Sequence, residues 1–191
     1  MPAGGVGWFE AAHGAWHAGG PGEFGRARGF QLWLALPVGQ ELGTVENVYL
    51  SPDAVARDGP ARVLVGAHGA AESPLYAGAS LNYLAVRLRA GESWRYQPAV
   101  NHSVGWLSLS TGRVRIPESV EAGELAVLDS SNAAIDLAAE VDTEFMIGSA
   151  MPHPHDLALG SYSVHTSPAS LRAGEQRLQE IQRRLQSEGR L

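Results

Sequence analysis

Apolar and polar residues alternate along the middle of the chain, between residues 81 and 129. In the segment LNYLAVRL, positions 82, 84, 86 and 88 fall on one face and the residues between them on the other, and a turn follows at Gly91. A period of two that ends at a glycine predicts a β-strand with one buried face. Two later segments share the pattern and each contains a turn glycine: 106–116 with Gly112, and 118–129 with Gly123. Strands separated by regularly spaced turns predict an antiparallel sandwich or small barrel.

Shorter apolar segments predict further strands on both sides of this region. Residues 51–60 (SPDAVARDGP) predict at most a short helix, because Ser-Pro-Asp is typical of a helix start and Asp-Gly-Pro of its end. The glycine-rich residues 1–25 contain two tryptophans and predict short strands and turns rather than a linker. The other predicted strands are 28–37, 45–50, 62–65, 135–139, 144–147 and 161–165.

The end of the chain predicts an amphipathic α-helix over residues 167–191. Ser167 is expected to cap it, and Pro168 takes the first helical position, where a missing N–H has no cost. Leucine and isoleucine at helical spacing form one stripe, and the arginines are expected on the solvated face: Leu171, Leu178, Ile181 and Leu185 in the stripe, and Arg172, Arg177, Arg183 and Arg184 outside it. The apolar stripe of this helix is expected to pack against the barrel or against a partner protein.

Composition narrows the chemistry that this chain can perform. The 191 residues have a formal net charge of -6, which argues against nucleic-acid binding, since phosphates are neutralised by a basic surface. The chain has no cysteine and all 14 basic residues are arginine, so thiolate and lysine chemistry are excluded. No run of about 18 apolar residues could span a membrane, and no secretory signal is visible at the start. We therefore expect a soluble, cytoplasmic protein.

Three segments resemble the pirin family of the cupin superfamily. GGVGWFEAAHGAWHAGG resembles that family's signature Gly-x-x-x-Trp-x-x-Ala-Gly-x-Gly-x-x-His-x-Glu, with Gly4 or Gly5, Trp8, Ala11, Gly14 and His17 in register. GFQLWLALP (29–37) resembles the strand between the family's two domains, and LGSYSVHTSPASL (159–171) resembles its closing strand and the start of its terminal helix. The resemblance implies a mainly β fold, a cupin-type antiparallel β-barrel or jelly-roll sandwich with a C-terminal α-helix. It divides the chain into remnant strands of a first barrel (1–37), a C-terminal-like barrel (38–166) and the helix (167–191).

The same resemblance implies an incomplete iron site. Pirins bind iron in their first barrel through a His-x-His pair, a further histidine and a glutamate. Here His17 matches the further histidine, Gly19 stands at the glutamate position, and the His-x-His pair has no counterpart. In the remaining barrel the positions of a cupin metal site fall near Gln97 to Val100, near Gly105 and at Ala126, and none of these is a ligand type. We expect no cofactor, with iron bound only if the first-barrel site is completed.

The remaining candidates have simpler structural interpretations. His153 and His155 have the spacing of a metal-ligand pair, but flanking prolines favour an ordered loop. Ser163 and His165 could form an acyl-transfer dyad, but no glycine-flanked nucleophile elbow accompanies them. His13 and His68 are expected in glycine-rich loops, and His102 in a loop at the mouth of the barrel. The tryptophans are expected mainly in the core: Trp8, Trp16, Trp33, Trp94 and Trp106.

Three functions remain open from the sequence. The favoured one is a pirin-like module with a degenerate metal site that binds a small ligand or a protein and is not an enzyme. The alternative is a metal-dependent dioxygenase of the quercetinase type, which would use His17 together with ligands that the sequence does not identify. A third is a homodimer or other complex in which strands of residues 4–25 pair with another chain, because unpaired strand edges tend to associate.

Overall fold

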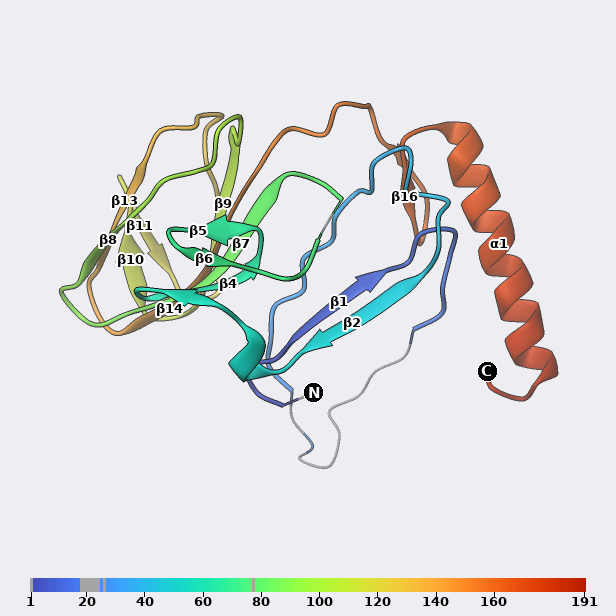
Figure 1. The fold of residues 1–191 in the computed structure, drawn as a ribbon, viewed down its shortest axis with the longest axis horizontal. Coiled ribbons are helices and arrows are strands. Elements are labelled where there is room, and N and C mark those ends of the chain that lie inside the picture. The colour runs from blue at the N-terminus through green and yellow to red at the C-terminus, as the bar shows by residue number, and fades with distance from the viewer. Residues whose placement is uncertain (1, 18–24, 26, 77) are drawn as a thin grey trace. The chain divides into compact units, whose positions relative to one another are not determined.

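The structure is a computed structural model that describes residues 2–17, 25, 27–76 and 78–191. It divides into two compact units. The first comprises Met1–Gly7 and Tyr49–Pro152, and the second comprises Trp8–Val48 and His153–Leu191. Figure 1 shows the strands of the first unit and, in red, the long helix of the second.

The larger sheet of the first unit is antiparallel and contains six strands within the described part of the chain. Its central strands β9, β14 and β7 are the longest, and they are the segments in which the alternation of apolar residues is clearest. In spatial order the sheet consists of β12 (Leu125–Val127), β9 (Val104–Thr111), β14 (Thr143–Ala150), β7 (Leu81–Leu88), β4 (Ala61–Val65) and β3 (Arg57–Asp58).

A smaller antiparallel sheet completes the sandwich, with four strands among the described residues. Its strands in spatial order are β11 (Ser119–Glu121), β10 (Arg113–Arg115), β13 (Ile135–Ala139) and β8 (Ser93–Tyr96). The same unit contains the ribbon of β5 (Ala67–His68) and β6 (Ala71–Glu72) and the short 3-10 helix η2 (Pro52–Ala54). The mainly β antiparallel architecture predicted from the alternation is confirmed.

The core of the first unit consists of apolar side chains from both sheets. Leu84, Leu107 and Ile147 come from the six-stranded sheet, and Val114 and Leu137 from the four-stranded one. All five are at most 1% exposed. Burial of such side chains is worth roughly 1.5–3 kcal/mol each. The interior of the sandwich is therefore filled with apolar groups.

The turn between β9 and β10 shows why the sequence has glycine there. Gly112 has φ +82°, and a Cβ atom at this position would lie 2.4 Å from the carbonyl oxygen of Asp142. Only glycine fits a left-handed conformation at this distance from a neighbouring backbone. The glycine thus marks the bend at which the chain passes from β9 in the larger sheet to β10 in the smaller one.

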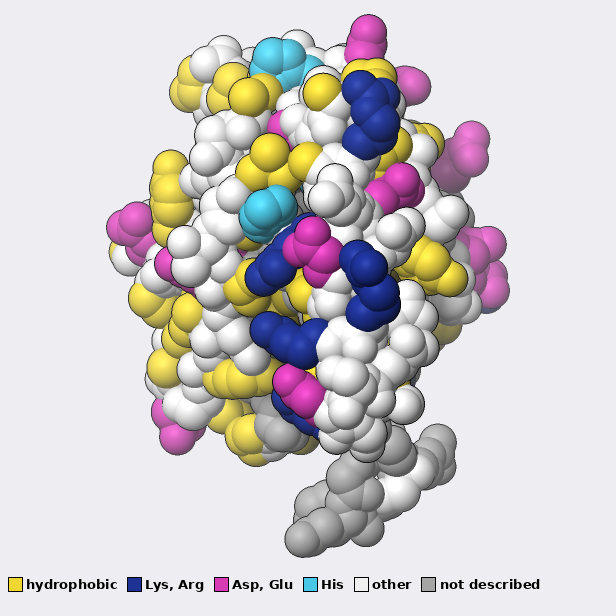
Figure 2. All heavy atoms as spheres, turned by 90° about the vertical axis from the view of Figure 1, so that its right-hand side faces the viewer, with side chains coloured by type: hydrophobic (Ala, Val, Ile, Leu, Met, Phe, Trp, Pro, Cys, Tyr) yellow, Lys and Arg dark blue, Asp and Glu magenta, His cyan; other side chains and the backbone are white. Residues whose placement is uncertain are grey.

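The second unit contains the helix α1 (Pro168–Ser187) and the ribbon of β15 (Ala158–Leu159) and β16 (Val164–His165). The Ser167 hydroxyl accepts a hydrogen bond from Ser170 N at 3.1 Å, so the predicted N-cap is confirmed. Gly174, Ile181 and Leu185 are its buried residues. Basic and acidic side chains are interspersed on the face of the molecule that carries α1 (Figure 2), and Arg177 pairs with Glu180 at 3.1 Å.

Strands β1 (Val6–Glu10) and β2 (Glu46–Leu50) pair in a two-stranded sheet. They fulfil the predictions of a short strand near the start and of a strand over residues 45–50. Among the described residues, no helix is long and apolar enough to cross a membrane.

One strand prediction is wrong, and another is too long. Residues 28–37 form no strand, and Trp33 in their middle is 74% exposed. These residues alternate between apolar and polar but form an irregular segment. A strand also needs a neighbouring strand to pair with, and the alternation does not supply one. The strand predicted over 161–165 is restricted to β16.

The tryptophans also divide between two environments. Trp94 packs against the core, and Trp106 lies over Gly148, where an added Cβ would be 2.1 Å from its indole ring. Trp8 is half-buried. Trp16 and Trp33 are exposed, so the prediction of a core position is wrong for these two. Both lie outside paired strands, where no sheet face is available to bury an indole.

Candidate functional site

His17, the predicted metal ligand, lies on the surface of the second unit. Its ring packs against Phe9 with 5.2 Å between ring centroids, and the side chain is exposed. Gly19, at the glutamate position of the resemblance, lies outside the described residues. Within the ranges that the structure describes, no group of three histidine, aspartate or glutamate residues is placed to hold a metal ion. The assignment of His17 as a ligand stays a prediction.

The barrel positions that correspond to a cupin metal site do not fit a metal ion. Gln97 uses its side-chain amide to donate to the carbonyl oxygens of Pro98 and Asn132, at 3.2 and 3.1 Å. Gly105 offers no side chain, and Ala126 packs against the apolar core. Zinc or iron would need at least three nitrogen or oxygen ligands converging at one point. These positions supply none.

A buried polar network lies at one end of the sandwich, around His102. The His102 ring is 2% exposed, and its Nε2 atom lies 2.8 Å from Ser80 Oγ. Its Nδ1 atom lies 2.9 Å from Ser149 Oγ, which is in turn 2.7 Å from Tyr96 Oη. Ser80 directly precedes β7, Tyr96 ends β8 and Ser149 belongs to β14. The network therefore joins both sheets to the loop that carries His102.

The network is uncharged at neutral pH. Burial lowers the pKa of His102, and a hydrogen bond to the Ser149 backbone only partly opposes this shift. Burial likewise raises the pKa of Tyr96, against smaller opposing effects of hydrogen bonds with Ser149 and Asn82. Because a buried charge without a partner is costly, the neutral forms of both rings are the stable ones. The cluster offers hydrogen-bonding atoms without a charge.

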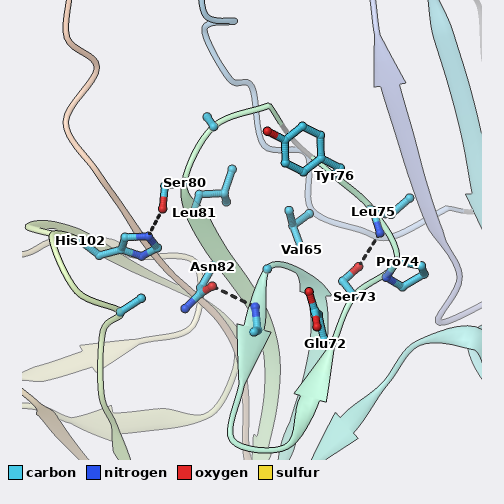
Figure 3. A pocket seen from close by; sticks show the side chains of 14 residues that line it. Val65, Glu72, Ser73, Pro74, Leu75, Tyr76, Ser80, Leu81, Asn82 and His102 are labelled. Carbon is cyan, nitrogen blue, oxygen red and sulfur yellow. Dashed lines mark hydrogen bonds between the residues drawn. The ribbon is translucent and has the colours of Figure 1, made fainter.

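Beside this network the first unit is hollowed by an open cavity of about 680 Å³. Figure 3 shows His102, Ser80 and Asn82 on one side of the cavity and Ser73, Pro74 and Leu75 on the other. The lining residues are Val65, Gly66, Ala67, Glu72, Ser73, Pro74, Leu75, Tyr76, Ala79, Ser80, Leu81, Asn82, Ala99 and His102. A cavity of this size can accept a small organic molecule.

The walls of the cavity are held by side-chain to backbone hydrogen bonds. Ser73 Oγ donates to Leu64 O at 2.7 Å and accepts from Leu75 N at 3.2 Å. Asn82 Oδ1 accepts from Ala67 N at 3.0 Å. These contacts fix the loop after β6 against β4 and the start of the ribbon β5–β6 against β7. The shape of the cavity is therefore a consequence of the native hydrogen bonding around it.

His153 and His155 belong to an irregular segment, as the flanking prolines suggest. The ring of His153 has its Nδ1 atom 3.2 Å from His155 O and its Nε2 atom 3.4 Å from Leu36 O. Both ring nitrogens therefore face backbone carbonyl oxygens of the second unit. This arrangement supports the interpretation as an ordered loop.

His165 and Glu41 form a buried pair in the second unit. Nδ1 of His165 lies 3.5 Å from Oε2 of Glu41, and that carboxylate accepts hydrogen bonds from Thr166 N and Oγ1, both at 2.7 Å. Burial raises the pKa of Glu41, but hydrogen bonds from Ser170 and Thr166 and the proximity of His165 outweigh it and leave this pKa below its ordinary value. The other ring nitrogen of His165 faces Gly174 of α1, where a Cβ would lie 2.5 Å from it. A substrate has no access to that nitrogen, so the acyl-transfer dyad is not formed.

The other two histidines differ in environment. His68 lies in β5 with its ring 5.2 Å from that of Trp94 and 5.9 Å from that of Tyr96, measured between centroids. It is thus part of an aromatic cluster rather than of a free loop. His13 is exposed.

The cavity was not predicted from the sequence, although one signal for it was present. Asn82 occupies the face of β7 that otherwise carries Leu84, Val86 and Leu88, and a polar residue among buried apolar ones requires partners. His102 follows Asn101, whose φ of +68° marks a tight turn. The other residues of the His102 network, Ser80, Tyr96 and Ser149, are far apart in the sequence. The alternation of apolar and polar residues could therefore not show that they meet.

Comparison with known proteins identifies the fold. No family model matches the chain, and no curated protein matches its sequence. Two structures of quercetin 2,3-dioxygenase from Acinetobacter baumannii are similar, with TM-scores of 0.72 and 0.67 at 17% and 16% identity. They match 78% of this chain and 54% and 50% of theirs. GK1651 from Geobacillus kaustophilus has a TM-score of 0.58 at 15% identity, over 65% of this chain and 54% of that one.

These similarities establish the architecture. The chain spans about half the length of the structures it matches. Sequence identities this low show the fold and not the activity. The mainly β fold with antiparallel sheets and a C-terminal helix, predicted from the sequence, is the fold of these cupin proteins. This chain therefore has a cupin-type fold.

Proposed function

We propose that this chain is a pirin-like cupin module with a degenerate metal site, which binds a ligand or a protein and does not catalyse a reaction. The observation that supports this function is the apolar filling of the barrel. Side chains such as Leu107, Leu109 and Phe145 occupy the interior from which cupin metal ligands would project. Polar groups gather instead beside the open cavity at His102.

Metal analysis of the purified protein tests this function. The protein is incubated anaerobically with ferrous iron, freed of excess metal and analysed for iron per chain, beside the variants His17→Ala and His13→Ala. We expect iron far below one equivalent in all three proteins. Full occupancy in the wild type that His17→Ala abolishes and His13→Ala preserves would overturn the proposal.

The alternative function is an iron-dependent dioxygenase of the quercetinase type. The observation that favours it is the similarity of fold to quercetin 2,3-dioxygenase at a TM-score of 0.72. It requires His17 as one ligand and further ligands that the sequence does not identify, because no group of three histidine, aspartate or glutamate side chains among the described residues is placed to hold a metal ion. Oxygen consumption with a flavonol substrate, dependent on added iron, would favour this alternative over the binding module.

We also propose that the chain forms a homo-oligomer through its first strands. Strands β1 and β2 form a two-stranded sheet, and such a pair is marginal by itself in water. Phe9 on β1 and Val48 on β2 are exposed apolar residues. A second copy could extend this sheet and cover these side chains. A single monomeric species in sedimentation velocity at high protein concentration would contradict this proposal.

A further inference from the structure

We propose that the cavity beside His102 binds a small organic cation, a protonated amine carried on an aromatic or aliphatic body. This inference rests on the proposed binding function and names its ligand class. Three properties of the cavity support the inference. The cavity has an apolar floor and one exposed aromatic ring, and its lining contains one carboxylate that has no basic residue beside it.

The apolar floor would hold the body of the ligand. Val65, Leu75 and Leu81 contribute aliphatic side chains to the lining, and all three are buried. They flank the cavity from β4, from the loop after β6 and from the start of β7. Contact with this surface removes the apolar part of a ligand from water, which is the main source of affinity in such sites.

Tyr76 supplies an exposed aromatic ring at the rim. Its side chain is 79% exposed although it lines the cavity, and Figure 3 shows the ring across the cavity from Glu72. An exposed ring has little to gain from its present position, since its apolar faces remain in water. A cation placed over the ring is attracted by its π electrons.

The charge of the lining residues determines whether the cavity favours a cationic or an anionic ligand. Among the described residues that line the cavity, Glu72 is the one with a formal charge at neutral pH, because the pKa of His102 is lowered by burial. The whole chain has a formal net charge of -6, which raises the local concentration of cations and repels anions. Ser80 is exposed, and its hydroxyl remains as a hydrogen-bonding group for an uncharged part of the ligand, whereas both ring nitrogens of His102 already have partners.

Three probes of similar size and different charge test the inference: 2-phenylethylammonium, 2-phenylethanol and phenylacetate. Affinities are measured on the full chain by chemical-shift titration at low ionic strength, where electrostatic contributions are least screened. We expect the cation to bind about ten-fold more tightly than phenylacetate, with the alcohol between them. The shifts are expected at the amides of Gly66, Ala67 and Ser80.

Two substitutions in the cavity and one control substitution outside it test whether the preference for the cation arises in the cavity. Glu72→Gln removes the charge with little change of shape and is expected to weaken the cation about five-fold without weakening the alcohol. Tyr76→Ala is expected to weaken all ring-bearing probes. The control Glu118→Gln removes an exposed carboxylate that does not line the cavity and is expected to leave all affinities unchanged.

The inference is overturned if phenylacetate binds as well as the cation, or if Glu72→Gln and Glu118→Gln have equal effects. It is also overturned if no probe shifts the cavity amides at millimolar concentration. None of these results depends on metal content. A wrong ligand class would therefore appear in these binding measurements, whereas a wrong binding function would appear as full iron occupancy.

Discussion

At the scale of single residues, an uncharged hydrogen-bonded network surrounds His102. Its ring is held between Ser80 and Ser149, at 2.8 and 2.9 Å, in surroundings that disfavour protonation. Two properties can be tested at this scale. One is the dependence of stability on pH, and the other is the cost of removing a shared partner.

The first prediction concerns pH. The pKa of His102 in the folded protein is lower than its ordinary value of 6.5, so below that value the unfolded chain binds more protons than the folded one. The contribution to the free energy of unfolding is therefore intact above about pH 6.5 and declines as the pH falls toward the lowered pKa. Urea unfolding between about pH 7.5 and pH 5 measures it.

A matched pair of histidine variants isolates this effect. His102→Gln is expected to flatten the pH dependence of stability over the same window, while lowering stability at neutral pH by about 1–2 kcal/mol through lost hydrogen bonds. His17→Gln, at an exposed position, is expected to change neither property. Equal slopes in the wild type and in His102→Gln would contradict the assignment.

The second prediction concerns Ser149, which is fully buried and contacts both His102 and Tyr96. Ser149→Ala leaves two buried polar atoms without this partner and is expected to cost about 1–3 kcal/mol of unfolding free energy. Ser108→Ala, on a half-buried side chain of the neighbouring strand β9 whose hydroxyl donates only a long hydrogen bond to Glu124 O at 3.3 Å, is the control and is expected to stay within about 0.5 kcal/mol of wild type. Comparable effects of the two substitutions would show that the network contributes nothing.

At the scale of elements, α1 is positioned by contacts that its own sequence does not reveal. Gly174 lies in the middle of the helix, where alanine would normally stabilise by about 1 kcal/mol. Here the glycine is required because the His165 ring occupies the space of a Cβ atom. The ring cannot move away easily, since it is 4% exposed and faces Glu41 on its other side.

The third prediction follows from this contact. Gly174→Ala is expected to lower the free energy of unfolding by about 1–3 kcal/mol, against the helix propensity of alanine. Gln182→Ala on the exposed face is expected to be neutral or slightly stabilising. In a His165→Ala background the cost of Gly174→Ala should largely disappear, and a double-mutant cycle by urea unfolding measures this coupling. Additive effects would contradict the contact.

How much of the structure could be predicted from sequence depends on the range of the interactions. The alternation in 81–88 and the cap Ser167 are local signals, and they predicted β7 and α1 correctly. Segment 28–37 has the same alternation and forms no strand, because pairing depends on a partner that the pattern does not contain. Asn82 was the one local signal for the cavity, and its shape could not be predicted because residues 65–67, 72–76, 79–82, 99 and 102 meet only in the folded chain.

At the scale of the whole molecule, the chain is a cupin-type sandwich with a filled interior. Quercetin 2,3-dioxygenase from Acinetobacter baumannii is similar over 78% of this chain at 17% identity, and a similarity at this identity shows the fold alone. The fourth prediction concerns association of these molecules.

If β1 and β2 mediate dimerisation, charges on that surface should prevent it. Phe9→Asp and Val48→Asp are expected to shift the protein to the monomer in sedimentation velocity, because carboxylates in an apolar interface are costly. Leu125→Asp, on the exposed edge strand β12, is the control and is expected to leave association unchanged. A shift to monomer in the control alone would place the interface elsewhere.

The central proposal is that the described side chains of this chain hold no metal ion, neither inside the barrel nor at His17. Anomalous diffraction at the iron absorption edge, from crystals grown anaerobically with ferrous iron, tests it most directly. The account predicts no anomalous peak coordinated by side chains of the chain. A fully occupied peak held by at least three of its side chains, with His17 among them, would contradict it.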